Sequence, residues 1–438
     1  MTGKIENGMD GQQIEKGPWK KTFFLIWSGQ AFSLLGSELV QFSLVWYLTR
    51  TTGSAAVLAL ASFTALTPQV ILYPFVGALV DRWNRQKVMI YADASIALVT
   101  LILALLFWSG KIAVWHIYAA LLLRGIGKGF HWPAMLASTS LLVPHRHLTR
   151  ISGLNQTVRG MLGIVAPVIA AVLLEVIPMA GILSIDIVTA LIAIFPLLLV
   201  VIPQPAGGRR LNGMSFAQIW QDVRSGMSYV FAWKGLMILG IAAAALNFLI
   251  HPGFTFVPLL VTEHFGGEAL DLSLLESAFS AGIVFGGMAL GVWGGFHKNI
   301  HTFLTGILGQ GLGIGLIAAA RPQDFQWAIV GMALSGLMQA MANGPILAII
   351  QTNVEAEIQG RVLTLLEGIL MAMTPLSLLV AAPMAKWIGV RGWLAFGAIG
   401  CLSMGAVGFF IPALIQIENP DYRRVKAQMS PTEEGAAE

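Results

Sequence analysis

The chain has 438 residues, of which 56% are hydrophobic and 11% charged. Soluble domains carry about 25% charged residues, so this composition excludes an ordinary soluble globular protein. The 26 lysines and arginines exceed the 22 aspartates and glutamates, which gives a formal net charge of +4. Because most cations lie in short loops between apolar runs, we attribute the excess to membrane topology and expect no nucleic-acid binding.

Apolar stretches long enough to cross a bilayer recur along the whole chain. A hydrocarbon core of about 30 Å needs about 20 apolar residues in a helix, and lipid offers no partner for open backbone groups. About twelve stretches meet this requirement, and the sequence therefore predicts an all-α polytopic membrane protein. In chain order they cover residues 22–48, 55–80, 88–109, 112–143, 152–176, 181–203, 236–262, 273–295, 302–320, 325–351, 362–388 and 392–416.

Loop charge predicts the orientation of these spans. Cations gather in every second loop, for example at Arg82, Arg85 and Lys87, and the alternate loops hold few. By the positive-inside rule, we expect a protein of the plasma (inner) membrane with both termini in the cytoplasm. We expect a cytoplasmic N-terminal tail, a six-helix half, a cytoplasmic linker, a second six-helix half and a cytoplasmic C-terminal tail. Their bounds are 1–21, 22–203, 204–235, 236–417 and 418–438.

The linker contains a helical pattern of apolar residues. Phe216, Ile219, Trp220, Val223 and Met227 fall at helical spacing, which favours an amphipathic helix on the inner membrane surface over a disordered segment.

The two halves resemble each other weakly. Residues 124–133 in the fourth span are echoed by residues 336–345 in the tenth, and Pro167 is echoed by Pro375. Such repeats are typical of transporters that hold substrate between two halves near the midplane. Glycines four residues apart, such as Gly309 with Gly313 and Gly287 with Gly291, predict close helix contacts.

The loop at residues 77–87 groups Asp81 with Arg82, Arg85 and Lys87. It resembles the signature between the second and third spans of the major facilitator superfamily, and Arg124 resembles that superfamily's arginine in the fourth span. Residues 132–135, 143–144, 259–264 and 359–362 resemble the macrolide-efflux type of proton-coupled drug antiporters.

This resemblance covers roughly residues 20–417. It implies the major facilitator fold, with two six-helix halves, and secondary active efflux of amphipathic, macrolide-like drugs by alternating access. One motif departs from the pattern. Drug exporters of the superfamily usually have Gly-Pro followed by paired glycines in the fifth span, whereas this chain has Ala166-Pro167 followed by Ala170-Ala171.

The resemblance also implies a conformation-sensing gating network. Its members are Gly77, Asp81, Arg82, Arg85, Lys87 and Arg124. Counted along their helices, Asp93 and Arg159 reach a depth similar to that of Arg124, so we expect Asp93 to pair with these arginines and Arg159 to join the network. One alternative is ordinary ion pairing that holds the third, fourth and fifth spans together. Another is that Arg124 lines the cavity and shifts with Glu38 during coupling.

Acidic side chains inside the spans are candidates for proton coupling, because a charge is costly there and usually faces a polar cavity or a partner. Glu38 lies well inside the first span, and we predict that it takes and releases a proton; a purely structural carboxylate is the alternative. Asp93 and Glu367 are further candidates, although Glu367 lies close to the interface. We rank Asp186 and Glu276, near outer span ends, below these.

Amide, aromatic, histidine and methionine side chains are candidates for a substrate cavity that accepts bulky, varied ligands. They are Gln30, Phe32, Gln41, Trp46, Phe130, His131, Asn247, Phe248, Met338, Met341 and Asn343. Most aromatic residues of such a chain will simply face lipid or the protein core.

We recognise no phosphate loop, zinc motif or nucleophile elbow, and we expect no cofactor, no metal, no catalytic residue and no enzymatic activity. The expected partners are a small-molecule substrate, protons and the lipid bilayer, with the chain acting as a monomer. Siderophore export and nutrient symport are alternatives within transport. A non-transporting receptor or assembly subunit is the alternative outside it, and the intramembrane acids favour transport.

Overall fold

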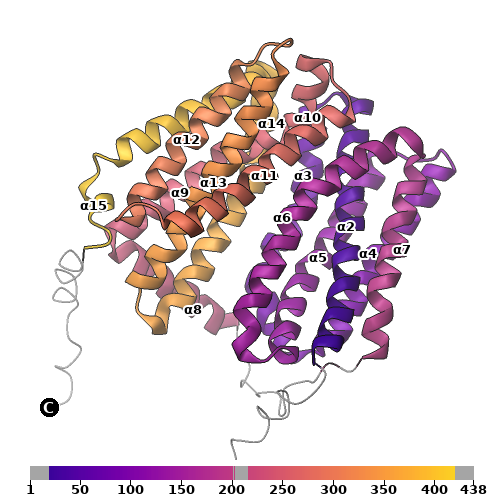
Figure 1. Ribbon diagram of the computed structural model, residues 1–438, viewed down its shortest axis with the longest axis horizontal. Coiled ribbons are helices and arrows are strands. Elements are labelled where there is room, and N and C mark those ends of the chain that lie inside the picture. The colour runs from indigo at the N-terminus through magenta and orange to yellow at the C-terminus, as the bar shows by residue number, and fades with distance from the viewer. Residues whose placement is uncertain (1–18, 201, 203–215, 420–438) are drawn as a thin grey trace, which may run out of the picture. The chain divides into compact units, whose positions relative to one another are not determined.

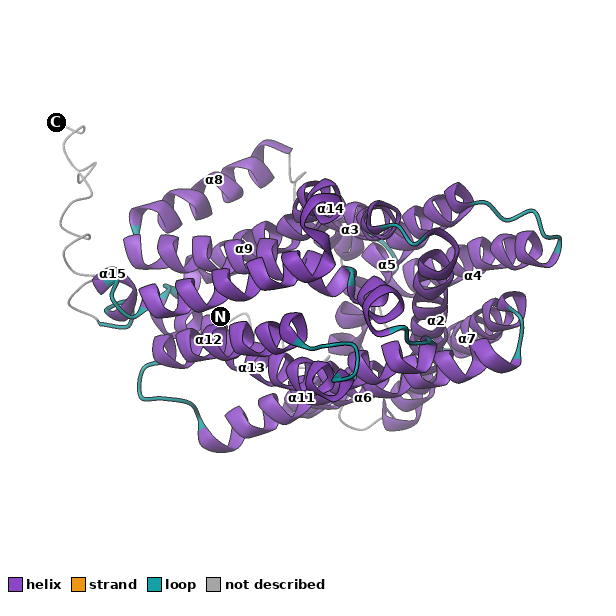
Figure 2. Cartoon of the chain, turned by 90° about the horizontal axis from the view of Figure 1, so that it is seen from above, coloured by secondary structure: helices purple, strands orange, loops and turns teal. Residues whose placement is uncertain are grey.

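The computed structural model describes residues 19–200, 202 and 216–419. Within these ranges the side chains of residues 77, 78, 81, 82, 145, 216–223, 356 and 357 lie outside the description. All regular elements of the described chain are helices (Figure 2), which confirms the predicted all-α class. The chain divides into two compact units: unit 1 contains Met1–Met214 and Thr255–Ser280, and unit 2 contains Ser215–Phe254 and Ala281–Glu438.

Unit 1 is a bundle of long helices (Figure 1). Helix α5 packs against α3 and α4, whereas α7 packs against α2 and α4. A short segment from later in the chain completes the unit. The helices are α2 (Trp19–Thr52), α3 (Ala55–Arg82), α4 (Arg85–Trp108), α5 (Val114–Leu142), α6 (His145–Val176), α7 (Met179–Leu199), α10 (Val257–Leu259), the π-helix η1 (Leu260–Phe265) and the first part of α11 (Ala269–Trp293).

Unit 2 is built around α12 and α13, which pack closely together, with α14 against α12. Its helices are α8 (Phe216–Ala232), α9 (Lys234–Thr255), the remainder of α11, α12 (Asn299–Ala319), α13 (Phe325–Asn353), α14 (Ala356–Gly408) and α15 (Pro412–Ile415). Helix α8 occupies most of the described part of the predicted linker. Its Gly226 lies beside Arg361 and Leu365 of α14.

The described helices fit the prediction of about twelve spans. Ten of them are long and apolar enough to cross a membrane. Helix α5 is not among the ten, because Arg124, Lys128 and His131 lower the hydropathy of its 29 residues. Helix α14 is one of the ten but consists of two helices, since Gly389 has φ 71° and ψ 169° and interrupts it. The positive φ at this position is one that glycine adopts readily.

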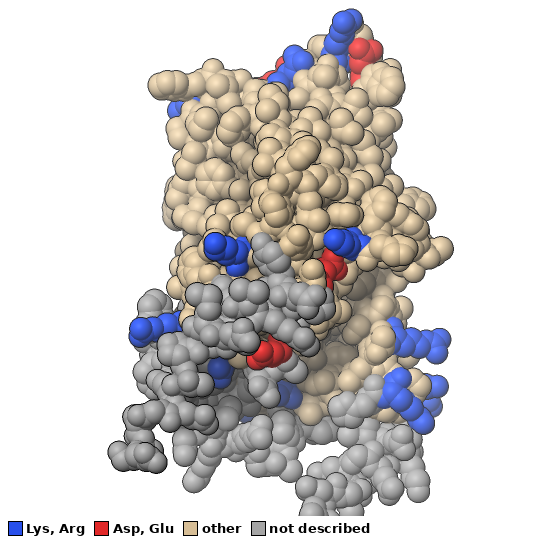
Figure 3. All heavy atoms as spheres, turned by 90° about the vertical axis from the view of Figure 1, so that its left-hand side faces the viewer, with Lys and Arg blue, Asp and Glu red and all other residues tan. Residues whose placement is uncertain are grey.

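The outer surfaces of the helices expose large apolar side chains. Trp108, Phe195, Val292 and Trp387 are among the most exposed. On the face drawn in Figure 3, an uncharged band separates the charged side chains at the upper end from those in the lower half. Extensive exposed apolar surface is rare in soluble monomers and matches contact with lipid. Together with the spans, it indicates a multi-pass membrane protein.

Glycines let α12 and α13 approach closely. A Cβ atom added at Gly313 would lie 2.8 Å from the carbonyl oxygen of Gly331, and one at Gly306 would lie 2.7 Å from the backbone nitrogen of Ala342. The close contact predicted for Gly309 and Gly313 is thus present. The contact predicted for Gly287 and Gly291 is not, because an added Cβ atom at either residue would meet nothing within 4 Å.

We expect Gly313→Val to destabilise the protein by about 1–3 kcal/mol, because backbone atoms of α13 cannot move away as a flexible side chain would. Gly287→Val is the matched control, since it makes the same chemical change where there is open space. Thermal unfolding of the purified protein in detergent should show a lower Tm for Gly313→Val alone. Equal Tm values for the two variants would contradict the close-packing interpretation.

Candidate functional site

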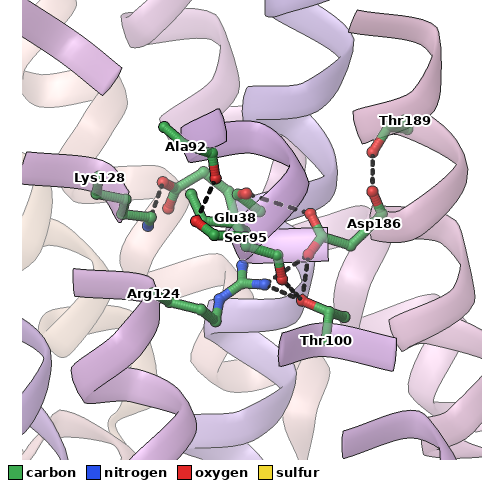
Figure 4. Close-up of polar contacts among 10 residues, drawn as sticks. Glu38, Ala92, Ser95, Thr100, Arg124, Lys128, Asp186 and Thr189 are labelled. Atoms are coloured by element: carbon green, nitrogen blue, oxygen red, sulfur yellow. Dashed lines mark hydrogen bonds and ion pairs between the residues drawn. The ribbon is translucent and has the colours of Figure 1, made fainter. Parts of the chain in front are cut away.

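Unit 1 holds several polar and charged side chains inside its apolar helices. They come mainly from α2, α4, α5 and α7 and form three groups, of which Figure 4 shows the first and the third. Two groups are buried and one is partly exposed. Because polar groups are costly inside a membrane protein unless they are paired or face a polar cavity, each group identifies a place where function or specific packing requires them.

The first group is a buried ion pair between Arg124 and Asp186. The guanidinium Nη1 atom lies 2.6 Å from the Oδ2 atom of Asp186, and the two side chains are only 3% and 2% exposed. Thr100 accepts a hydrogen bond from Arg124 and donates one of 2.9 Å to Asp186. The hydroxyl of Ser37 donates to the other carboxylate oxygen at 3.2 Å. These contacts join α2, α4, α5 and α7 at one point (Figure 4).

This pair corrects two sequence-based expectations. Arg124 was expected to pair with Asp93, and Asp186 was ranked low, yet Asp186 is the residue that Arg124 contacts. A signal for this pair was available. Counted from their helix starts at Val114 and Met179, Arg124 lies about 15 Å and Asp186 about 10 Å along the axis. Both helices begin on the same predicted side of the membrane. The two residues therefore differ in depth by about 5 Å, which a long arginine side chain can span.

The second group contains Asp93, Gln30 and His131. Gln30 Nε2 donates a hydrogen bond of 3.0 Å to Asp93 Oδ2, and His131 Nε2 lies 2.7 Å from Gln30 Oε1 and 3.3 Å from Asp93 Oδ1. All three side chains are buried. Gln30 and His131 were predicted to line a substrate cavity, but in this conformation they face each other and Asp93. The cluster connects α2, α4 and α5.

The third group is centred on Glu38, whose side chain is 47% exposed. Its Oε1 atom lies 3.8 Å from Nζ of Lys128 (Figure 4). Arg159 of α6 and Glu276 of α11 also interact electrostatically with Glu38. Glu38 is therefore a carboxylate in an apolar helix that is open to its surroundings, unlike Asp93 and Asp186. The charge of such a group acts on the cation beside it.

The structure does not bring Arg159 into the group around Arg124. Instead its guanidinium stacks on the indole ring of Trp132 at 3.4 Å from the ring centroid. Arg85 is buried beside the carbonyl oxygen of Ala137, whereas Lys87 is exposed. The side chains of the other predicted gating residues, Gly77, Asp81 and Arg82, lie outside the described part of the structure.

Sequence reasoning missed a connection made by Gln86 at the start of α4. Its amide nitrogen donates to the carbonyl oxygens of Leu197 and Val200 at the end of α7, and its amide oxygen accepts from the backbone nitrogen of Ile202. These bonds satisfy backbone groups that a helix end leaves open. Nothing in the local pattern around Gln86 distinguishes it from a solvated loop amide.

The other predicted cavity residues differ in exposure. Phe32 and Asn343 are exposed, and Trp46 and Met341 are buried. The half-buried candidates are Gln41, Phe130, Asn247, Phe248 and Met338. Phe130 stacks with Trp83, and Asn247 bonds to His251 at 2.9 Å within α9. Glu367, predicted as a proton site, is exposed. The sulfur of Met338 lies beside Gly309, so this methionine packs α13 on α12.

The fold, the intramembrane charges and the comparison with known families agree. The model of the Major Facilitator Superfamily matches residues 26–270 and 252–435 of the chain. The chain belongs to the major facilitator superfamily. The predicted resemblance is thereby confirmed, and the chain is placed in a family of transporters.

Relatives of this superfamily member include efflux proteins. Macrolide efflux protein A of Streptococcus pyogenes is 33% identical over 375 residues, which cover 86% of this chain and 92% of the relative. Macrolide efflux protein A of Enterococcus faecalis is 31% identical over 325 residues, covering 74% and 99%. Multidrug efflux pump Tap of Mycobacterium bovis is 22% identical and covers 81% of this chain and 84% of the relative.

A solved superfamily structure has the same fold. A D-xylose-proton symporter has a TM-score of 0.69 at 14% identity, and the alignment covers 92% of this chain and 98% of the symporter. At this identity the likeness shows the fold and carries no information about substrate.

Proposed function

We propose that this protein exports amphipathic, macrolide-like small molecules in exchange for protons, by alternating access of two six-helix halves in the plasma membrane. The observation that supports efflux is the 33% identity to a macrolide efflux protein over most of both chains. Siderophore export has less support, because the relative named Staphyloferrin A transporter covers only 36% of this chain. We further propose that the halves are residues 22–203 and 236–417, with both termini cytoplasmic, and that the transporter acts as a monomer.

Proton coupling is assigned to Glu38. When this carboxyl group is ionised, it attracts Lys128 across 3.8 Å. Protonation removes the negative charge, so the attraction ends and Lys128 becomes free to change its position. A cationic group on the substrate competes for the same carboxylate, because one negative charge cannot fully balance two cations. Proton and substrate binding thus exclude each other at Glu38, which is the requirement for exchange.

Glu38→Gln tests this assignment. Glutamine has nearly the size of glutamate and can also form hydrogen bonds, but its side chain does not gain or lose a proton near neutral pH. In energised inverted vesicles, we expect substrate accumulation driven by a pH gradient to fall at least about tenfold, which corresponds to about 1.4 kcal/mol. A macrolide or a fluorescent amphipathic dye serves as the substrate.

Glu175→Gln is the matched control, because Glu175 is an exposed acid of α6 in the same unit. It should leave accumulation unchanged. If wild-type accumulation survives collapse of the gradient and Glu38→Gln behaves as wild type, proton coupling through Glu38 is wrong. The gating role of residues 77–87 stays a prediction.

A further inference from the structure

Among the described residues, unit 1 buries two carboxylates, and they differ in the partner that balances their charge. Asp186 is paired with Arg124, whose guanidinium does not lose its proton in proteins. Asp93 forms no ion pair with a lysine or an arginine in the described part of the chain. Its partner is the Nε2 atom of His131, 3.3 Å from Oδ1, and histidine is a cation only when both ring nitrogens carry a proton.

Hydrogen bonds place one hydrogen on the ring of His131. The oxygens of an ionised carboxylate only accept, so Gln30 Nε2 donates to Asp93 Oδ2 at 3.0 Å and Gln30 Oε1 is left as an acceptor. His131 Nε2 lies 2.7 Å from this oxygen, a distance at which one of the two atoms carries a hydrogen, and the ring nitrogen is the one that can. With this hydrogen alone, the ring is neutral and does not balance the charge of Asp93.

One more proton makes the group neutral. An ionised Asp93 beside a neutral ring would be an unbalanced charge within the helix bundle, which is costly in surroundings of low dielectric constant. A proton on Nδ1 of His131 gives a carboxylate–imidazolium pair, and a proton on Asp93 gives a neutral acid beside a neutral ring. Both arrangements remove the unbalanced charge. The group therefore binds one proton more than a solvated aspartate and a solvated histidine hold at about pH 8.

The lysine and the arginine of α5 do not take the place of this proton, because each has an acid of its own. Lys128, three residues before His131, interacts with it electrostatically but lies 3.8 Å from the carboxylate of Glu38. Arg124 lies 2.6 Å from the carboxylate of Asp186. The charges of these two pairs largely cancel, and the acid beside His131 is left to be balanced by a proton.

We propose that Asp93 and His131 form a second proton-binding site of the transporter, which keeps one proton closed off from water in this conformation. Their side chains are only 5% and 9% exposed, whereas that of Glu38 is 47% exposed. The proposal rests on the proposed exchange and extends it from one proton to two. When water reaches the pair, the proton passes to water and leaves an ionised carboxylate and a neutral imidazole, both of which water then solvates.

Spectroscopy locates the proton without any transport. Solid-state NMR of the reconstituted full-length protein with isotope-labelled histidines shows whether both ring nitrogens of His131 are protonated, and infrared spectroscopy detects a protonated Asp93. His131→Gln and Asp93→Asn identify the two signals by their loss. At about pH 8, where both groups would have lost this proton in water, we expect one of the two signals to be present. A neutral His131 beside an ionised Asp93 at this pH overturns the proposal.

Transport shows whether this proton takes part in exchange. In inverted vesicles with the membrane potential held at zero, each exchanged proton changes the accumulation ratio of a macrolide about tenfold per pH unit of gradient, so two protons change it about 100-fold. Asp93→Asn combined with His131→Gln removes both titratable groups but keeps hydrogen-bonding side chains. We expect the dependence to fall from about 100-fold to about tenfold. A tenfold dependence in the wild type, or equal dependence in both proteins, contradicts a second exchanged proton.

His116→Gln is the matched control on α5, where the ring accepts a hydrogen bond from the backbone nitrogen of Ala113. It should leave the 100-fold dependence unchanged. If a pH gradient drives no accumulation at all, the proposed exchange is wrong, and the spectroscopic result still decides whether the pair binds a proton. Gel filtration identifies a double variant that does not fold, and Asp93→Asn alone then takes its place, because it removes the carboxylate that holds the proton.

Discussion

Asp186→Asn is expected to lower the free energy of unfolding by about 3–5 kcal/mol, the cost of leaving a buried charge without its partner. Arg124 is only 3% exposed, so water cannot replace the lost carboxylate. One guanidinium nitrogen, Nη2, already lacks a hydrogen-bond partner within the described residues. Asparagine keeps the size of the side chain and a single acceptor oxygen, and the change therefore isolates the charge. Chemical or thermal unfolding of the purified protein measures the effect.

Two further variants distinguish loss of the ion pair from a nonspecific effect of the substitution on stability. Asp324→Asn makes the same substitution at a residue whose side chain does not cap its helix, and it should leave stability unchanged. Arg124→Gln combined with Asp186→Asn removes both charges, and we expect part of the lost stability to return. If Asp186→Asn is as stable as the wild type, the pair is not a structural connection. If the double variant is the least stable, charge imbalance is not the cause.

Asp93→Ala is expected to destabilise the protein by about 1–3 kcal/mol, because it leaves a buried donor without an acceptor. This donor is Gln30 Nε2 at 3.0 Å from the carboxylate, whereas His131 Nε2, at 3.3 Å, keeps Gln30 Oε1 as a partner at 2.7 Å. Since the cluster joins three helices, we also expect slower efflux at temperatures where the variant remains folded. Unfolding and vesicle transport measure the two effects.

Asp93→Asn identifies the charge state of the cluster. If His131 carries a proton on both ring nitrogens, asparagine costs nearly as much as alanine, because a buried cation loses its counter-charge. If His131 is neutral, asparagine restores one acceptor and most of the stability returns. Ser95→Ala is the control on the same helix, where the hydroxyl bonds to Ala92 of its own turn. Wild-type stability for Asp93→Ala would show that the cluster is not needed to hold these helices.

The sequence predicted the spans well because length and apolar content are local properties of the chain. The limits 55–80 and 325–351 differ by no more than a few residues from Ala55–Arg82 and Phe325–Asn353. The interruption of α14 at Gly389 also lies at the predicted boundary between the last two spans, residues 388–392. Helix α5 was predicted despite its cations, since the apolar residues before and after them still span the required length.

Pairing was harder to predict, because it depends on how each helix is rotated about its own axis. Counting residues from a loop gives the depth of a side chain, but it does not give the direction in which the side chain points. Packing of α7 against α4 turns Asp186 toward Arg124, whereas Asp93 faces Gln30 and His131.

By itself, the sequence determined that this chain crosses a membrane about twelve times, belongs with the major facilitators and carries an acid at Glu38 deep in its first span, because hydropathy and motifs act over short stretches. Only the tertiary structure decided which charges meet. It buried the Arg124–Asp186 pair, left Glu38 beside Lys128 and half open, and placed Arg159 on Trp132 rather than in the predicted network. The physical reason is that side chains meet through the packing of helices distant in sequence, which no local pattern records.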